Sequence, residues 1–135
     1  MIHYQQQNPQ GDFRVVFLHG SGGGPETPFM DFFADYCVHL GAEVVRPDFP
    51  YWQQVRVNGK PRPPNRMPVL VEAVTELLNH LQQDHKPLVL MGVCSIFGPI
   101  AFSMRPIRCV MNCELAAYSS CVLHDMSTIL HPACS

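Results

Sequence analysis

The feature that most constrains the fold is the alternation of short apolar runs with stretches of helical periodicity. FRVVFL (13–18), AEVVRP (42–47) and PLVLMG (87–92) are rich in apolar and β-branched residues, as buried strands are. The stretches 28–40 and 70–81 between them carry apolar residues at helical spacing. This order predicts right-handed crossovers and a mostly parallel sheet with helices on both faces. We therefore expect a three-layer α/β fold.

The two expected helices and the segment between them have different local signals. Thr27 places a capping hydroxyl before Pro28 at the first helical position, and Gly41 is placed to end that helix. Residues 47–68 contain many prolines and predict a long loop, of a kind that is usually functional or mobile. The apolar face of the first helix is expected to comprise Phe29, Phe32, Phe33, Tyr36, Cys37 and Leu40, and that of the second Leu70, Val74, Leu77, Leu78 and Leu81.

The last third of the chain differs in character from the part before it. Five of the six cysteines lie beyond residue 92, and the apolar periodicity fades there, although RCVMNCEL (108–115) is a candidate fourth strand. We interpret the chain as one domain, 1–135, with a regular core over 13–98 and an atypical tail over 99–135. A change of reading frame or exon near residue 92 would explain the shift. A sheet cut short there is expected to self-associate through an exposed edge.

Composition excludes several classes of protein. A net charge of -2 argues against a general nucleic-acid or anionic-membrane surface. The N-terminus lacks the basic start and apolar run of a signal peptide, and no stretch reaches the length of a membrane span. The cysteines show neither C-x-x-C nor zinc-like spacing, so we expect free thiols, no metal and no cofactor. The default expectation is a soluble cytoplasmic protein with a small-molecule substrate.

The first motif with chemical potential is LHGSGGG (18–24), directly after the first expected strand. A His-Gly turn in this place lets backbone N–H groups point at a developing negative charge, so Gly20 and Ser21 are candidate oxyanion-hole residues. The alternatives are a plain glycine loop and a phosphate-binding turn. Because the carboxyl ends of parallel strands share one edge, this loop is expected to lie beside the end of the 87–92 strand.

The second motif, GVCSIFG (92–98), resembles a nucleophile elbow, whose pattern is G-x-S-x-G. With Cys94 as the nucleophile, Gly92 occupies the tight position two residues before it, but Ile96 stands two residues after it. With Ser95 as the nucleophile, both small positions are lost. Steric reasoning therefore favours Cys94 over Ser95, and the alternative is a buried cysteine at a strand end.

A nucleophile also needs a base and an orienting acid. Beyond Cys94, Asp125 and His131 are the one pair in the hydrolase order, and the alternative is that both are surface residues of the tail. His19, Tyr51 and Arg66 are candidate substrate contacts, because the proline-rich segment could cap the site and attract an anion. The alternative for that segment is a solvated loop stiffened by its prolines.

Four blocks of the sequence resemble a known family in order and spacing. They are VVFLHGSGGGPETPFM, VVRPDFPYW, GKPRPPNRMPVLVEA and KPLVLMG, all within residues 13–92. They are similar to the small α/β-hydrolase-like proteins related to dienelactone hydrolases, a group that includes the testis-expressed-protein-30-like proteins.

The resemblance implies an α/β-hydrolase-like fold, here cut short, and hydrolysis of ester-like or related acyl substrates. Family members continue with G-K-S-M-G-G-R-[VI]-A, whose serine is the nucleophile, where this chain has GVCSIFGPIA (92–101). The rival hypothesis is a non-catalytic remnant or interaction module that keeps the sheet and lacks a complete triad.

Overall fold

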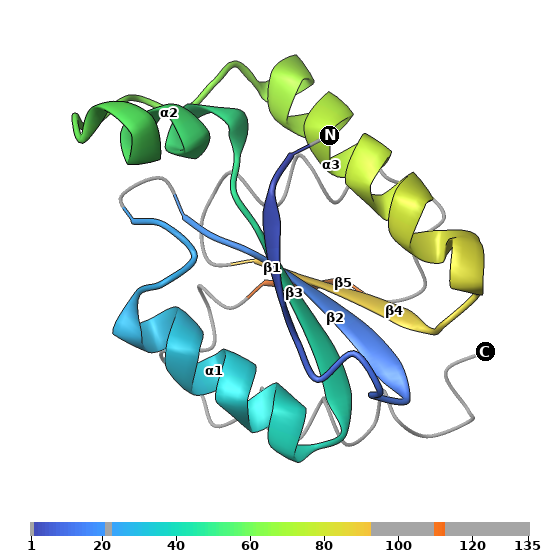
Figure 1. Ribbon diagram of the computed structural model, residues 1–135. Coiled ribbons are helices and arrows are strands. Elements are labelled where there is room, and N and C mark those ends of the chain that lie inside the picture. Colours follow the sequence, from blue (N-terminus) through green and yellow to red (C-terminus); the bar gives the residue numbers. More distant parts are fainter. Residues whose placement is uncertain (1, 21–22, 93–109, 113–135) are drawn as a thin grey trace.

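The computed structural model describes residues 2–20, 23–92 and 110–112, and these form a sheet covered by helices on both faces (Figure 1). The strands are β1 (Tyr4–Gln7), β2 (Phe13–Leu18), β3 (Ala42–Pro47), β4 (Leu88–Gly92) and β5 (Val110–Asn112). The helices are α1 (Pro28–His39), α2 (Pro50–Asn58) and α3 (Met67–Leu81), followed by the 3₁₀ turn η1 (Gln82–Asp84). The expected strands β2, β3 and β4 are thus confirmed.

The spatial strand order is β1-β3-β2-β4-β5. β2 pairs in parallel with β3 and with β4, and β4 pairs in parallel with β5. β5 lies within the candidate fourth strand 108–115, which confirms that prediction. β1 was not predicted, because its sequence YQQQ has no apolar alternation, and it pairs antiparallel with β3 at the sheet edge. The mostly parallel α/β fold is therefore confirmed, with one antiparallel pair added.

Each strand of the sheet centre is buried on both faces, so its side chains alternate between two separate cores. Val15 and Phe17 of β2 pack with α1, whereas Val16 and Leu18 pack with α3. All six residues of β2 and of β3 are buried. The sequences of both strands therefore lack a regular alternation of polar and apolar residues, as expected for a parallel sheet between helix layers.

Helix α1 begins and ends where its sequence predicts, and most of its expected apolar face packs against the core, with Phe32 as the exception. The Met30 amide donates to Thr27 Oγ1 at 3.3 Å, and Gly41 follows the helix with φ of 92°. The buried residues are Met30, Ala34 and Cys37, whereas Phe32 is 66% exposed. The prediction that Phe32 faces the core was wrong. Small Ala34 and Cys37 let the helix approach the sheet, and Phe29 and Phe33 pack against the same core while partly exposed.

The prediction of a continuous loop over residues 47–68 was also wrong, because α2 lies within it. Pro50 occupies the first turn, where a missing N–H costs nothing, and Gly59 caps the other end with φ of 65°. The Gly59 amide donates to the Val55 carbonyl at 2.8 Å. The prolines of this segment lie at the start of α2 or beyond Gly59. They therefore bound the helix instead of preventing it.

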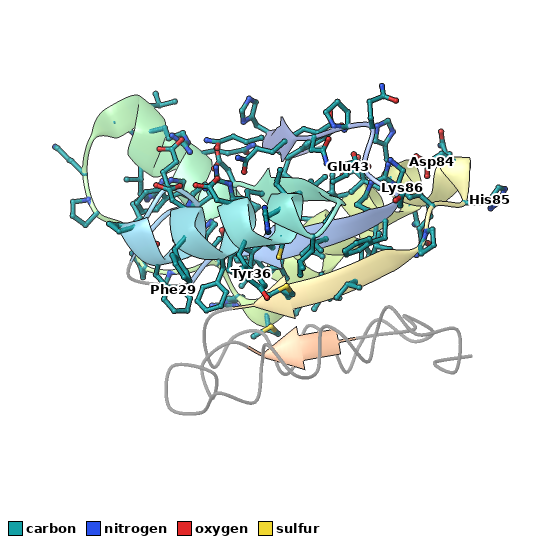
Figure 2. The ribbon with its side chains drawn as sticks, turned by 90° about the horizontal axis from the view of Figure 1, so that it is seen from below. Phe29, Tyr36, Glu43, Asp84, His85 and Lys86 are labelled. Carbon is teal, nitrogen blue, oxygen red and sulfur yellow. The ribbon has the colours of Figure 1, made fainter. Side chains whose placement is uncertain are left out.

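A closed charge network joins the amino ends of β2, β3 and β4, and Figure 2 shows Glu43, Asp84 and Lys86 gathered there. Buried Glu43 accepts hydrogen bonds from Arg14 Nε at 3.1 Å and from Lys86 Nζ at 2.7 Å. Arg14 also donates to both oxygens of Asp84, at 3.1 and 2.6 Å, and to the Leu81 carbonyl. Because the Leu81 carbonyl is among the last four of α3, which lack an α-helical partner, the hydrogen bond from Arg14 fastens the end of the helix to the sheet.

Candidate active site

The register between β2 and β4 places the two predicted motifs side by side. Leu18 and Gly92 are Cα partners in neighbouring parallel strands. The glycine loop that begins at His19 and the segment that follows Gly92 therefore start about 4.8 Å apart at the same edge. Among the predicted catalytic residues, Ser21, Cys94, Ser95, Asp125 and His131 lie outside the described residues. Gly20, His19, Tyr51 and Arg66 lie within them.

His19 is the first residue of the loop after β2, and both of its ring nitrogens have partners inside the protein. The backbone amide of Phe49 donates to Nε2 at 3.2 Å, so Nδ1 carries the proton and lies 2.9 Å from the Gly20 carbonyl oxygen. The side chain is 3% exposed, and burial lowers the pKa of His19 below its ordinary value. The ring is therefore a neutral, fixed link between the glycine loop and the start of α2.

The Gly20 carbonyl accepts a second hydrogen bond from across the site. Tyr51 Oη donates to it at 3.1 Å, and Tyr51 is buried in the first turn of α2. The rings of His19 and Tyr51 meet edge to face with centroids 5.8 Å apart. Two donors from separate segments thus fix the direction of one carbonyl in a glycine-rich loop that would otherwise have several conformations.

Trp52 packs against the same loop on the next position of α2. A Cβ on Gly24 would lie 2.2 Å from Trp52 Cε2, so the two segments approach closely where the loop has no side chain. The ring centroids of Trp52 and His19 are also 5.7 Å apart. Its buried Nε1 has no hydrogen-bond partner among the described residues. The glycine at position 24 is therefore required by packing.

Arg56 ties α2 to the loop and to the end of β3 through charge. Its guanidinium binds both oxygens of buried Asp48, with Nε–Oδ2 of 2.7 Å and Nη2–Oδ1 of 3.0 Å. It also pairs with Glu26 at 3.1 Å. The hydrogen bonds that Arg56 donates to Asp48 and to Glu26 raise the pKa of Arg56, and the one that Glu26 accepts from Arg56 lowers the pKa of Glu26. Arg56 therefore remains charged and holds the C-terminal part of the loop.

A second arginine holds the end of the glycine loop where α1 begins. Arg46 of β3 donates to the Pro25 carbonyl at 2.9 Å and to Asp31 Oδ1 at 2.6 Å. Both partners lie near the first turn of α1, since Asp31 belongs to it and Pro25 precedes its cap. The loop is thus anchored at its start by His19 and Tyr51 and at its end by Arg46 and Arg56.

Tyr51 and Arg66 were both predicted to contact a substrate, but the structure places them in different surroundings. Tyr51 contacts the glycine loop, whereas Arg66 is exposed at the N-cap of α3, where its carbonyl accepts from the Val69 amide at 3.0 Å. Contact of either residue with a substrate stays a prediction. Phe49, Trp52 and Asp48 were not predicted to shape the site. The available signal was their place directly after β3, at the carboxyl edge of the sheet.

Two further observations concern the described part of the chain. In that part, no three His, Cys, Asp or Glu side chains cluster so as to hold a metal ion. None of its helices is both long and apolar enough to cross a bilayer.

Comparison with known proteins places this geometry in a family. The family model for the alpha/beta hydrolase domain matches residues 11–118, a range that continues past Gly92 and includes β5. A search of curated proteins finds no match. Among solved structures, a dienelactone hydrolase from Anabaena variabilis is similar in fold, with a TM-score of 0.62 and 16% sequence identity. The similarity covers 81% of this chain and 56% of that hydrolase, so this chain spans little more than half of its length.

Proposed function

The chain belongs to the alpha/beta hydrolase family, and from this premise we propose that it hydrolyses ester-like or related acyl substrates. The nucleophile would stand at the turn after β4, with Cys94 as the first candidate and Ser95 as the second. The observation that carries the proposal is the register of Leu18 with Gly92. Because of this register, the glycine loop and the nucleophile segment begin at neighbouring points of the sheet edge. A nucleophile that attacks a carbonyl needs the donors that stabilise the oxyanion close to it.

The fixed Gly20 carbonyl supports the oxyanion part of the proposal. In a planar trans peptide the carbonyl oxygen and the following N–H point in opposite directions. His19 and Tyr51 both donate to the Gly20 oxygen. They would therefore aim the amide N–H of Ser21 away from themselves and hold it ready for a developing negative charge. In this reading His19 and Tyr51 are positioning residues, since they act through the loop.

The end of β4 favours Cys94 over Ser95 as the attacking group. The strand ends at Gly92, two residues before Cys94, where the elbow needs a residue without a side chain. The Cys94 thiolate would add to the acyl carbon and expel the alcohol, which takes up a proton. Water would then release the acid from the thioester and restore the thiol. His131 is proposed as the base that moves these protons, and Asp125 as the acid that orients it.

Hydrolysis of p-nitrophenyl acetate by the purified chain tests this function. We expect turnover that is abolished in Cys94→Ala and retained in Ser95→Ala. The reverse pattern would move the nucleophile to Ser95. Turnover that survives both substitutions, or none in the unmodified chain, would contradict the proposal and favour a non-catalytic member of the family.

Alkylation by iodoacetamide gives a readout that does not depend on turnover. Cys37 is an internal control, because it is fully buried on α1 and burial raises its pKa to about 11. We expect Cys94 to react much faster than Cys37 when the sites are compared by mass spectrometry. Equal slow rates would show that Cys94 is not presented at an open turn.

A further inference from the structure

The segment between α2 and α3 is exposed and carries prolines and cations together. Its sequence is KPRPPNR (60–66), and it runs along the outside of the molecule from the end of α2 to the start of α3 (Figure 1). Each residue from 59 to 64 is exposed, as is Arg66. None of the described hydrogen bonds or ion pairs involves the side chains of Lys60, Arg62 or Arg66. These three cationic side chains therefore add no described polar contact to the chain's own fold.

The backbone of this segment is restricted to an extended, polyproline II-like form. Pro61, Pro63 and Pro64 each fix φ, and each residue before a proline is directed to the extended region. Arg66, the last residue, has φ of -60° and ψ of 148°, which are polyproline II values. The residues 60–66 belong to no helix or strand. Both ends are fixed by helices, so a partner would lose little conformational entropy in binding the segment.

Charge and apolar surface gather at the same place. The chain has a net charge of -2, but residues 59–68 contain Lys60, Arg62 and Arg66 and no acidic residue. Among the described residues the exposed large hydrophobic side chains are Phe32, Val57 and Val69. Two of them flank the segment, with Val57 84% and Val69 42% exposed. These two apolar side chains belong to the helix that precedes the segment and to the helix that follows it.

We propose that residues 61–66 form a docking segment for a proline-recognition module of the SH3 class. Pro61, Pro64 and Arg66 match the pattern P-x-x-P-x-R. A polyproline II helix has three residues per turn, so Pro61 and Pro64 lie on one face about 9 Å apart. That face fits grooves lined by aromatic rings, and Arg66 would meet carboxylates beside the groove. The inference does not depend on the proposed hydrolase activity.

A nucleic acid or another polyanion would use the three cations but not the prolines. The spacing of Pro61 and Pro64 favours the aromatic groove, because such a groove binds proline rings three residues apart, whereas a polyanion would contact the cations alone. The two occupants differ in their response to salt. Contacts with proline rings persist at high ionic strength, whereas exposed charge pairs are screened.

The experiment titrates the full chain into a ¹⁵N-labelled SH3 domain that accepts P-x-x-P-x-R ligands. We expect saturable shifts of the groove tryptophan side-chain signal. Pro61→Ala combined with Pro64→Ala should weaken binding by about tenfold or more. Pro68→Ala is the matched control, since Pro68 is also exposed but lies outside the pattern, and it should bind like the unmodified chain. Far-UV circular dichroism verifies that each variant is folded.

Several outcomes would overturn the inference. No shift with the unmodified chain would do so, as would equal binding by the double proline variant. Binding that Arg66→Glu abolishes, that the proline substitutions spare and that about 0.5 M salt removes would identify a charge-only contact. Loss of binding in both the double proline variant and Arg66→Glu, with Pro68→Ala unaffected, is the result that supports it.

Discussion

The two ends of the sheet are held together by different physical means. At the amino end, Arg14, Glu43, Asp84 and Lys86 form a closed network in which charges pair with charges. Burial alone would raise the pKa of Glu43, but the hydrogen bonds from Lys86, Gln6 and Arg14 outweigh it and the pKa is lowered. The carboxyl end also has charge pairs, such as Arg56 with Asp48, but its distinctive contacts are those of His19 and Tyr51, which both donate to a single backbone carbonyl.

We infer from this difference that the amino end of the sheet mainly stabilises the fold and that the carboxyl end mainly positions the glycine loop. The amino-end network satisfies its buried charges and fastens α3, so its loss should be felt by the whole fold. The carboxyl-end contacts orient one peptide group of a glycine-rich loop and leave Trp52 Nε1 without a partner in the described part of the chain. Their loss should disturb function more than stability. Each prediction below tests that contrast.

The largest effect is expected at the amino end, for Arg14→Met. Removing the guanidinium leaves Glu43, whose side chain is 1% exposed, with weaker compensation of its charge. The free energy of unfolding should fall by about 3–5 kcal/mol, as measured by urea denaturation. The double variant Arg14→Met/Glu43→Leu removes the buried charge as well and should be more stable than Arg14→Met. A single variant within about 1 kcal/mol of the unmodified chain would show that this end is not the stabilising one.

The next effect concerns the contact between the glycine loop and α2. In Gly24→Ala the new methyl group would meet the Trp52 ring, so loop or ring must shift at a cost of about 1–3 kcal/mol. Because Trp52 is the single tryptophan, its fluorescence reports the shift directly.

The matched control for this change is Gly59→Ala. Gly59 has φ of 65° and open space around it, so alanine there costs about 1–2 kcal/mol of backbone strain without touching Trp52. Its tryptophan spectrum should stay that of the unmodified chain. If Gly24→Ala also leaves the tryptophan spectrum unchanged, the close contact between Gly24 and Trp52 is contradicted.

A smaller change in stability is expected for Tyr51→Phe. The variant keeps the ring but loses the donor to the Gly20 carbonyl, which should cost about 1 kcal/mol in unfolding free energy. Ester turnover should fall by about tenfold or more, because the oxyanion donor is no longer held in direction. Tyr4→Phe on β1 is the control and should retain turnover. Equal turnover in both variants would assign Tyr51 a packing role alone.

The smallest effect is a dependence of stability on pH through His19. Its pKa is lowered in the folded state, from an ordinary value of 6.5. Below about pH 6.5 the unfolded chain therefore takes up a proton before the folded chain does, and stability falls as pH falls. Above that pH the stability from this group is complete. Urea midpoints between pH 5 and 8 should show this step in the unmodified chain and lack it in His19→Gln.

Much of the fold follows from the sequence because the signals are local. The bounds of β2 and β3 were predicted from runs of adjacent residues, and the ends of α1 from Thr27, Pro28 and Gly41. Caps and turns depend on atoms within a few residues, so a linear reading contains what is needed. The same reading indicated β5 within 108–115, and the family match to residue 118 includes it.

The tertiary structure decided the features whose partners are distant in the chain. β1 is a strand because its polar residues pair with β3, as Gln5 does with Arg46. The N-terminal turn of α2 packs against the glycine loop through contacts such as those of His19 with the Phe49 amide and of Tyr51 with Gly20. In each of these contacts the two residues are about thirty positions apart in the sequence, so no periodicity or cap signal predicts it. The energy of the contacts comes from burial that exists only in the folded chain. Local sequence signals thus determined β2, β3, β4 and α1, whereas packing determined β1 and which carbonyl of the glycine loop is held.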